Sequence, residues 1–450
     1  MPIKHKIAPA ATQVIARLHE AGYEGYLVGG AVRDLMLDIE PKDYDIATDA
    51  TPKQVKAVFR SRARIIGRRF RLVHVYQSRR VFEVSTFRRK PSLQERKGRE
   101  DDDGLRVWRD NEFGTLEQDA YRRDFTVNAI YYDPLNEASA LTDLVGGVKD
   151  MEEKLVRTIG DAHERIAEDP VRILRAAKLV GQYGFSLTED VDDAVRSAHA
   201  QITECSQARL LEELNKILKK PFTLPTFTCM QEIGLLQHLL PTLSQAWDTD
   251  TGRLTRELLA QRDRLMQQEE AFPSRVTGLA AMILPFALER FGTSDPAALW
   301  HNFGGIDREL QHLVKEFLAP YNVPRHMSAK IRDALLLQPK LLSGRSRKRM
   351  QRHPEYNRSR DLFEVCVPVL GIDPELLATW PRQQPEEYRP ASKKGSGSKR
   401  GRKTGKKRGR KKPQGKPRRS TGRYSSQSKA PKRTQPDKSD EDGHEQRRDG

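Results

Sequence analysis

Two aspartates separated by a single residue, Asp43 and Asp45, lie in a short run with β character that includes Tyr44 and Ile46. Side chains alternate between faces along a strand, so both carboxylates are expected on the same side. Carboxylates held side by side repel each other and favour a cation between them. Because Mg²⁺ prefers oxygen ligands and completes its shell with substrate phosphates, we expect Asp43 and Asp45 to hold magnesium.

A glycine pair precedes the aspartates in a pattern typical of phosphate binding. The apolar run 26–28 leads into Gly29 and Gly30, and an amphipathic segment follows at once. This order predicts a strand, a tight turn and the N-terminus of a helix. Glycine lets the backbone approach a bulky anion, the helix start presents unpaired N–H groups, and Arg33 adds a forked donor. The sequence therefore predicts a nucleoside triphosphate held by glycines and metal.

The spacing of these residues resembles that of a known enzyme superfamily. The string GGAVRD, followed by KDYDIAT over residues 42–48, resembles the signature of nucleotidyltransferases related to polymerase β. The fuller string is similar to the bacterial branch that contains poly(A) polymerases and CCA-adding enzymes. The resemblance implies ATP as substrate, Mg²⁺ as cofactor and RNA 3′ ends as acceptors. Residues 65–75, IIGRRFRLVHV, resemble the poly(A) polymerases of that branch, although Arg68 and Arg69 alone fit an exposed turn.

A second motif follows further along the chain. Residues 119–128 fit a helix that projects a charged Arg-Arg-Asp cluster just before apolar residues. Such a cluster is usually solvated surface. Here the run RRDFT resembles the motif with which the family contacts the sugar and phosphates of the incoming nucleotide. The resemblance assigns this role to Arg123 and Asp124, and Asn128 also matches the motif.

A third acidic residue has two candidates. Glu83 alternates with Val81 and Ser85 along a predicted strand, and a third carboxylate beside an aspartate pair helps to hold a second metal. An exposed strand glutamate fits this position equally well. Asp124 competes for the same role, and we place it first because its motif match is longer. Asp124 therefore joins Asp43 and Asp45 as a predicted catalytic residue.

A third motif could read the nucleobase. Pro170 separates two predicted helices, and Arg172 and Arg175 share one helix face at i, i+3. A carboxylate paired with a guanidinium presents the donors and acceptors of a Watson–Crick edge. An ion pair between Glu168 and Arg172 can coexist with this arrangement. The string EDPVRILRA resembles the base-recognition motif of the branch, so Asp169, Arg172 and Arg175 become nucleotide-binding candidates.

The elements around these motifs predict an α+β head. Helical spacing covers residues 8–22, and Thr51 with Pro52 begins a second helix. Short runs rich in β-branched or aromatic residues predict strands at 63–66, 71–76 and 81–86. We expect a small mixed sheet with flanking helices on one side. The polar residues 88–115 predict a mobile loop over the site.

Beyond residue 190 the chain reads as helical. Apolar residues recur at helical spacing between prolines, which predicts an all-α neck and body whose leucine-rich faces form a core. The dense basic stretch 344–360 predicts a surface that contacts RNA. We place the catalytic head at residues 1–150, the neck with the base-recognition motif at 151–225, the RNA-binding body at 226–390 and a tail at 391–450.

Most of the net charge of +18 lies in the tail. Residues 391–450 contain 22 Lys and Arg against 6 Asp and Glu, while the first 390 residues are close to neutral. Its Lys, Arg, Gly, Ser and Pro content predicts a disordered tail that binds polyanions such as RNA. Three distant cysteines indicate a reducing compartment. With no signal peptide or apolar span in view, we expect a cytoplasmic protein.

These features together predict a template-independent poly(A) polymerase that adds adenylate from ATP to RNA 3′ ends. The resemblance implies that such tails mark RNA for decay, with the RNA-decay machinery as a partner. A CCA-adding tRNA nucleotidyltransferase is the alternative that shares every catalytic motif. A non-catalytic basic RNA-binding protein is the alternative of another class, which the intact Asp43 and Asp45 disfavour.

Overall fold

The computed structural model describes residues 6–67, 71–90, 112–136, 140–268, 274–292, 303–345 and 347–383. Contacts separate residues 1–385 from residues 386–450, and every described residue belongs to the first unit. Arg68 and Arg69, most of the predicted loop and the basic tail lie outside the described residues.

The head is built on one seven-stranded sheet with the order β3-β4-β5-β2-β1-β6-β7. Strands β2 and β5 run parallel, and the other neighbouring pairs run antiparallel, which confirms the predicted small mixed sheet. The strands are β1 Tyr26–Val28, β2 Asp45–Thr48, β3 Ala63–Ile66, β4 Leu72–Gln77, β5 Arg80–Thr86, β6 Ile130–Tyr132 and β7 Leu141–Asp143.

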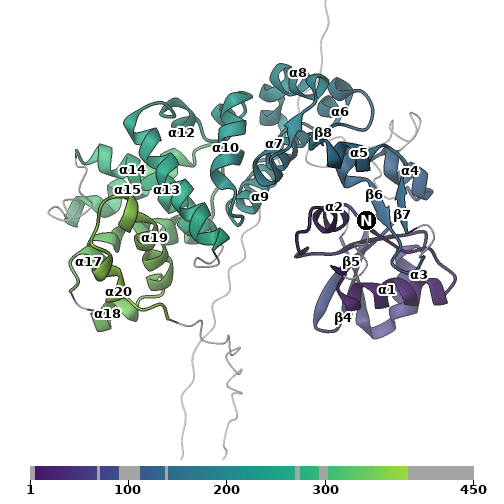
Figure 1. Cartoon of the computed structure of the whole chain (residues 1–450). Helices are drawn as coiled ribbons and strands as arrows, with labels where there is room; N and C mark the ends of the chain where they lie inside the picture. Colours follow the sequence, from purple (N-terminus) through teal and green to yellow (C-terminus); the bar gives the residue numbers. More distant parts are fainter. Residues whose placement is uncertain are drawn as a thin grey trace, which may run out of the picture. The chain divides into compact units, whose positions relative to one another are not determined.

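One face of this sheet carries the main core of the head. Helices α1 Pro9–Glu20, α2 Gly30–Met36 and α3 Pro52–Phe59 supply apolar side chains to it, and the strands add residues such as Leu27 and Ile46. Figure 1 shows these elements together around the N-terminal part of the chain. Because Ile46 points into this core, its neighbours Asp45 and Ala47 point to the opposite face.

The opposite face holds a smaller apolar cluster and the charged residues of interest. Val28, Ala47 and Tyr131 from the strands pack there against Ala120 of helix α4 Leu116–Tyr121. The expectation of helices on one side only is therefore incomplete, because α4 also contributes to this second face.

The predicted helix over residues 119–128 is wrong in its bounds. Helix α4 begins at Leu116, where Thr115 and Gln118 form a capping box, and it ends at Tyr121. Phe125 has extended backbone dihedrals and forms an isolated bridge with Thr158. A short 3₁₀ helix, Thr126–Asn128, follows. The pairing of Phe125 with a distant segment prevents a continuous helix.

The neck is mainly helical, and Pro170 separates two of its helices, but it also contains one short sheet that the all-α expectation did not include. Its elements are α5 Gly147–Glu152, α6 Ala162–Glu168, α7 Val171–Tyr183, α8 Glu189–Ala198, α9 Gln207–Ile217 and a two-stranded parallel sheet of β8 Leu155–Val156 and β9 Ser186–Leu187. The N–H of Val171 donates to the carboxylate of Asp169 at 3.3 Å, which supports the start of α7.

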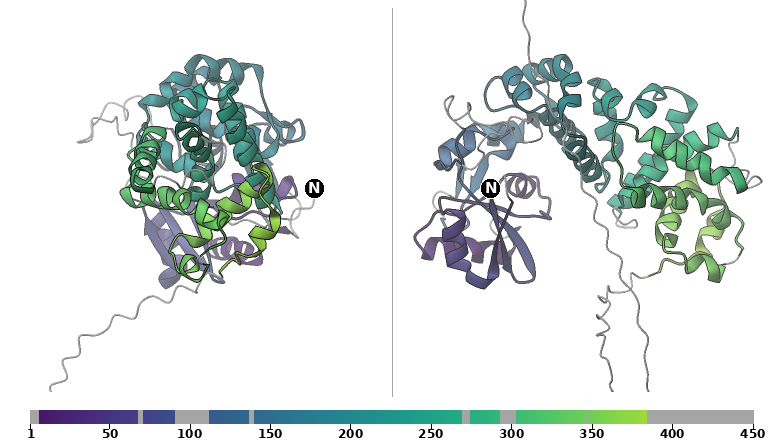
Figure 2. Two further views of the ribbon diagram at one scale, coloured as in Figure 1. Left: turned by 90° about the vertical axis from the view of Figure 1, so that its left-hand side faces the viewer. Right: turned by 180° about the vertical axis from the view of Figure 1, so that it is seen from behind.

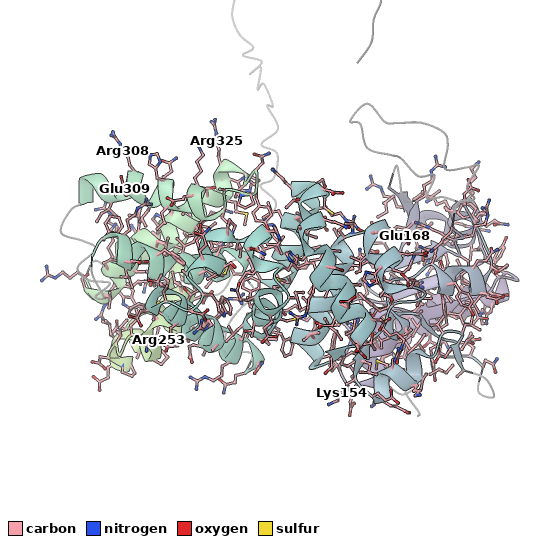
Figure 3. The ribbon with its side chains drawn as sticks, turned by 90° about the horizontal axis from the view of Figure 1, so that it is seen from above. Lys154, Glu168, Arg253, Arg308, Glu309 and Arg325 are labelled. Carbon is pink, nitrogen blue, oxygen red and sulfur yellow. The ribbon has the colours of Figure 1, made fainter. Side chains whose placement is uncertain are left out.

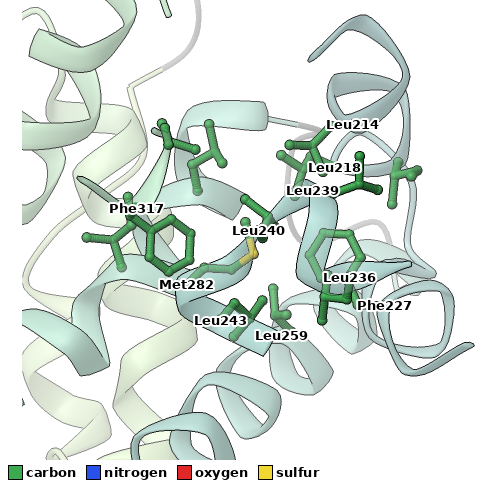
Figure 4. Close-up of a cluster of buried hydrophobic side chains, with 14 of the residues drawn as sticks. Leu214, Leu218, Phe227, Leu236, Leu239, Leu240, Leu243, Leu259, Met282 and Phe317 are labelled. Carbon is green, nitrogen blue, oxygen red and sulfur yellow. The ribbon is translucent and has the colours of Figure 1, made fainter. Parts of the chain in front are cut away.

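In its described residues the body consists of helices alone (Figure 2). Its helices are α10 Thr223–Glu232, α11 Leu236–Leu239, α12 Pro241–Gln245, α13 Asp250–Gln267, α14 Arg275–Arg290, α15 Phe303–Phe317, α16 Arg325–Leu336, α17 Gln338–Leu342, α18 Arg347–Gln351, α19 Tyr356–Val369 and α20 Pro374–Ala378. Their apolar faces meet in one core that also includes the neck helices; Figure 4 shows Phe227, Leu259 and Met282 within it.

A smaller core closes the far end of the body. Trp380 and Tyr356 are buried there with Leu341, and the indole N–H of Trp380 donates to the carbonyl of Leu341 at 2.9 Å. Within the described ranges, no helix combines the length and apolar character that crossing a membrane requires.

Candidate active site

The glycine turn lies at the centre of the charged face. Gly29 ends β1 with φ +72°, a conformation that glycine adopts without strain, and it precedes the first residue of α2. A Cβ atom on Gly29 would lie 3.6 Å from Nη1 of Arg123 and 3.9 Å from Oδ2 of Asp45. On Gly30 it would lie 3.3 Å from Nη2 of Arg33. The turn thus brings open backbone, a guanidinium and a carboxylate to one place.

The predicted carboxylate pair gains a third member from the neighbouring strand. Asp45 lies opposite Glu83 in the parallel register of β2 and β5. Asp43 lies in the bend just before β2, outside the strand run expected for it, and its charge acts on Asp45. All three residues are exposed. The side chain of Asp45 is open to water on one side, but the surrounding protein removes much of the hydration of its carboxylate. This desolvation, with the charges of Glu83 and Asp43, raises the pKa of Asp45 to about 6, against the opposing effect of Arg123.

These carboxylates do not by themselves form a complete metal site. Over the ranges that the structure describes, no group of three or more His, Cys, Asp and Glu is arranged to hold a metal ion. Mg²⁺ needs only one or two protein carboxylates when water and substrate phosphates supply the other oxygens. A carboxylate whose pKa is raised by neighbouring carboxylates, as that of Asp45 is, belongs to a donor set that such a cation would stabilise.

Arg123 is held in place by a buried carboxylate that sequence reasoning missed. Asp119 is 1% exposed, and its Oδ2 accepts from Nη2 of Arg123 at 2.8 Å and from the hydroxyl of Tyr131 at 2.7 Å. Its Oδ1 accepts from Nε of Arg122 at 2.9 Å. Burial opposes the charged form of Asp119, but the two arginines outweigh it and lower the pKa of Asp119 to about 2. Asp119 therefore holds Arg123, the residue predicted to contact the nucleotide, in place.

Arg33 lies beside the turn with its guanidinium fully engaged. Its Nη1 donates to Oδ1 of Asn128 at 2.7 Å, and its Nη2 donates to Oδ1 of Asp34 at 2.7 Å. The guanidinium also stacks over the ring of Tyr183 in α7, 4.3 Å from its centroid. Arg33 thus joins α2 to the neck. A phosphate contact by Arg33, as predicted, would have to replace some of these partners.

Asp124 lies with Arg175 rather than with Asp45. Its Oδ2 accepts from Nη1 of Arg175 at 3.3 Å, and its Oδ1 accepts from the amide of Asn128 at 3.2 Å. Burial raises the pKa of Asp124, but Arg175 and these hydrogen bonds outweigh it and hold the pKa below its usual value. The strand register therefore places Glu83 beside Asp45, whereas the charged partner of Asp124 is Arg175.

The base-recognition candidates Asp169, Arg172 and Arg175 are distributed over three ion pairs, of which that of Arg175 with Asp124 is described above. Arg209 of α9 binds Asp169 with both terminal nitrogens, at 2.9 and 2.7 Å. The expected pair between Glu168 and Arg172 is present at 3.2 Å, and Lys90 of the head lies 3.1 Å from Glu168. Figure 3 labels Glu168. Asp169 and Arg172 are adjacent through a backbone hydrogen bond of 3.0 Å, but their charged groups contact different partners.

Two further residues link the neck to the head motif. Arg165, 3% exposed, donates to the backbone carbonyls of Arg122 at 2.8 Å and of Arg123. Lys220, just beyond α9, interacts with the charges of Lys42 and Asp43. Burial and Lys42 lower the pKa of Lys220. Their distance in sequence from the motifs explains why pattern alone did not find them.

Comparison with known proteins identifies the family of this chain. Residues 25–157 match the family described as "Poly A polymerase head domain", and residues 184–246 match "Probable RNA and SrmB- binding site of polymerase A". Poly(A) polymerase I of Haemophilus influenzae is 32% identical over 380 residues, 82% of this chain and 83% of that protein. Poly(A) polymerase I of Escherichia coli O157:H7 is 31% identical over 386 residues, with 83% and 82% covered.

CCA-adding enzymes are also similar. That of Geobacillus thermodenitrificans is 36% identical over 229 residues, 51% of this chain and 54% of that protein. The solved structure of the Bacillus stearothermophilus CCA-adding enzyme in complex with CTP superposes with a TM-score of 0.59 at 25% identity, covering 82% of this chain and 81% of that one. With both the extended match to poly(A) polymerases I and the head-domain match in place, the chain belongs to the poly(A) polymerase family of nucleotidyltransferases.

Proposed function

We propose that this enzyme transfers adenylate from ATP to the 3′ ends of RNA without a template. The observation that supports this most directly is the convergence at Gly29, where Arg123 and Asp45 lie within 4 Å of the position of a Cβ atom. A phosphate-binding turn, a guanidinium and a cation-binding carboxylate are what transfer of a nucleotidyl group requires.

Asp43 and Asp45 would hold Mg²⁺, with Glu83 as the third carboxylate in place of Asp124. When bound, the cation lowers the pKa of the RNA 3′-hydroxyl and neutralises charge on the pyrophosphate. The raised pKa of Asp45 supports this assignment, because a divalent cation would relieve its repulsion with Glu83 and Asp43.

The residues of the chain position the reacting groups. Gly29 and Gly30 let the triphosphate approach the backbone, and Arg123, fixed by Asp119, contributes positive charge beside it. The RNA 3′-oxygen forms a bond to the α-phosphorus while the bond to the β-phosphate oxygen breaks, and pyrophosphate leaves.

Arg33 joins the triphosphate contacts if the nucleotide displaces one of its present partners. Asp124, Asp169, Arg172 and Arg175 form the wall that would contact the sugar and the base. Their existing ion pairs hold the carboxylate and guanidinium groups in defined orientations before the nucleotide binds.

Adenylate addition is favoured over CCA addition by the extent of similarity. In sequence, the poly(A) polymerase I relatives match more than four-fifths of this chain, whereas the CCA-adding enzyme of Geobacillus thermodenitrificans matches 51%. In fold, a CCA-adding enzyme covers 82% of the chain, so the sequence match carries the preference. In this proposal the enzyme acts in mRNA processing, the poly(A) tails that it adds mark RNA for decay, and the RNA-decay machinery is a partner.

The three unpaired cysteines support a cytoplasmic location. In the proposed domain organisation the head ends at residue 150, the neck at residue 225 and the body at residue 390, where the tail begins.

Replacing Asp45 tests the proposal. We expect Asp45→Ala to abolish extension of an RNA primer in the presence of ATP and Mg²⁺ while leaving the circular dichroism spectrum unchanged. Asp248→Asn, at a 94% exposed side chain, is the matched control and should extend the primer at the wild-type rate. An Asp45→Ala protein with near wild-type activity would show that the cation assignment is wrong and would revive the non-catalytic alternative.

A further inference from the structure

The helical body contains a basic cavity that the proposed reaction does not use. Its volume is about 580 Å³, and it lies where the first turns of α14, α16 and α19 meet the segment that contains Arg382. Five basic side chains and one acidic side chain are among its lining residues, namely Lys219, Arg275, Lys330, Arg358, Arg382 and Asp361. The lining therefore has a clear excess of positive charge.

Part of this charge has no acidic partner among the residues that the structure describes. Arg358 pairs with Glu355 at 2.6 Å, and Arg382 pairs with Asp361 at 3.2 Å. Among the residues that the structure describes, Lys219, Arg275 and Lys330 form no ion pair. The first 390 residues are close to neutral, so this local excess does not follow from overall composition.

The backbone adds to the positive potential. Helices α14, α16 and α19 have 16, 12 and 14 residues, and each presents its N-terminal end to the cavity. No side chain caps α16 or α19, although the N–H groups of Met327 and Tyr356 in their first turns already donate to backbone carbonyls. Helix N-termini and unpaired cations together favour an anion with several oxygen acceptors, such as a phosphate group.

The lining suits a phosphate group better than a nucleobase. Its apolar members are Val276, Met327 and Pro354, and its one aromatic ring among the described residues is that of His326. The amide of Asn357 is occupied by the backbone of Gln383, donating to its carbonyl at 3.0 Å and accepting from its N–H at 3.1 Å. The ring of His326 and the Asp361–Arg382 pair are the main groups in the lining suited to a base, whereas its excess of cations suits phosphate.

We propose that this cavity binds backbone phosphates of the acceptor RNA, away from the 3′ end that reacts. The inference rests on the proposed function in that RNA is the acceptor. It also assigns a place to the basic stretch 344–360, which contributes Pro354, Asn357 and Arg358 to the lining. Phosphate contacts fix position without reading sequence, so this site would accept RNAs of diverse sequence.

A double substitution in the full chain tests the proposal. Arg275→Gln with Lys330→Gln removes two unpaired cations from the cavity, and Arg308→Gln with Lys315→Gln removes two exposed cations from α15 as the matched control. Arg308 projects away from the body in Figure 3. Binding of a single-stranded RNA oligonucleotide is measured without nucleotide over a salt series, and thermal melts verify folding.

We expect the cavity variant to lose about 0.7 per phosphate contact, or roughly 1.4, from the slope of log affinity against log salt. Its affinity should be about 25-fold lower at 0.1 M salt if the two lines converge at 1 M. The KM for RNA should rise, while kcat at saturating RNA and the KM for ATP stay at wild-type values. The control variant should follow the wild type.

An unchanged RNA affinity and slope in the folded cavity variant would overturn the proposal. A raised KM for ATP with unchanged RNA affinity would also overturn it, since the phosphate source would then be free nucleotide. Because the binding assay requires no catalysis, failure of the wild type to extend any primer would refute the proposed function without affecting this result.

Discussion

The most instructive perturbation is Asp119→Asn, because this side chain holds Arg123 against the glycine turn. Asn keeps the shape of the side chain but removes its charge, leaving Arg122 and Arg123 without their buried carboxylate. The side chain of Asp119 is 2% exposed, so water cannot replace the lost interactions. We expect a less stable head and a misplaced Arg123.

The magnitude follows from the pKa of Asp119. Burial alone would raise it, but Arg123 and Arg122 lower it from 3.8 to about 2. At 1.36 kcal/mol per pKa unit, the folded protein favours the charged form by about 2.4 kcal/mol. Removing one member of a buried ion pair costs about 3–5 kcal/mol. We therefore expect Asp119→Asn to reduce the free energy of unfolding by about 3 kcal/mol at pH 7.

The pH dependence has a defined sign. Because the folded pKa lies below the unfolded one, the stabilisation is present above about pH 4 and is lost as the pH falls through about 2. The difference between wild type and variant should shrink over that window. Urea unfolding followed by circular dichroism measures it. Asp248→Asn, whose partner Arg256 is 4.0 Å away at the surface, should change stability by less than about 0.5 kcal/mol.

The activity of Asp119→Asn supplies a second readout. A misplaced Arg123 should lower kcat/KM for ATP even at low temperature, where the variant remains folded. A stability loss below about 1 kcal/mol at pH 7, or a difference that persists unchanged at pH 2, would refute the reasoning.

Two other predictions concern nucleotide and RNA binding. Arg175→Ala should raise the KM for ATP roughly tenfold because its ion pair with Asp124 is lost, and Arg175→Lys should recover only part of this loss because lysine lacks the forked geometry. Steady-state kinetics measure both variants, and an unchanged KM for ATP would show that Arg175 is not part of the site. Deleting residues 391–450, which contain 22 of the 80 basic residues, should weaken RNA binding and reduce its salt dependence without slowing the chemical step. An unchanged slope of log affinity against log salt would contradict this prediction.

Much of the head could be predicted from local patterns. The strand, glycine turn and helix around Gly29 follow from residue types whose conformational preferences are strong. Thr51 and Pro52 begin α3 as expected, and the capping box confirms why. Alternation in β2 fixes the side to which Asp45 points, but Asp43 lies in the bend before the strand, so alternation does not place it.

The residues that sequence reasoning missed depend on tertiary contacts. Asp119 and Arg123 are four residues apart and read as a surface ion pair, but Tyr131 of β6 and the sheet bury them. Arg209 lies 40 residues from Asp169 and meets it only through the packing of α9. The choice between Glu83 and Asp124 required the register of β2 with β5.

The central claim is that this enzyme selects ATP and extends RNA of arbitrary sequence. Its most direct test incubates the purified chain with a primer that is not a tRNA, Mg²⁺ and each of the four nucleotides separately, and resolves the products on a sequencing gel. We predict long runs of A from ATP and little addition from CTP. Efficient addition of CTP to a truncated tRNA, halting after three nucleotides when ATP is also present, would contradict the account.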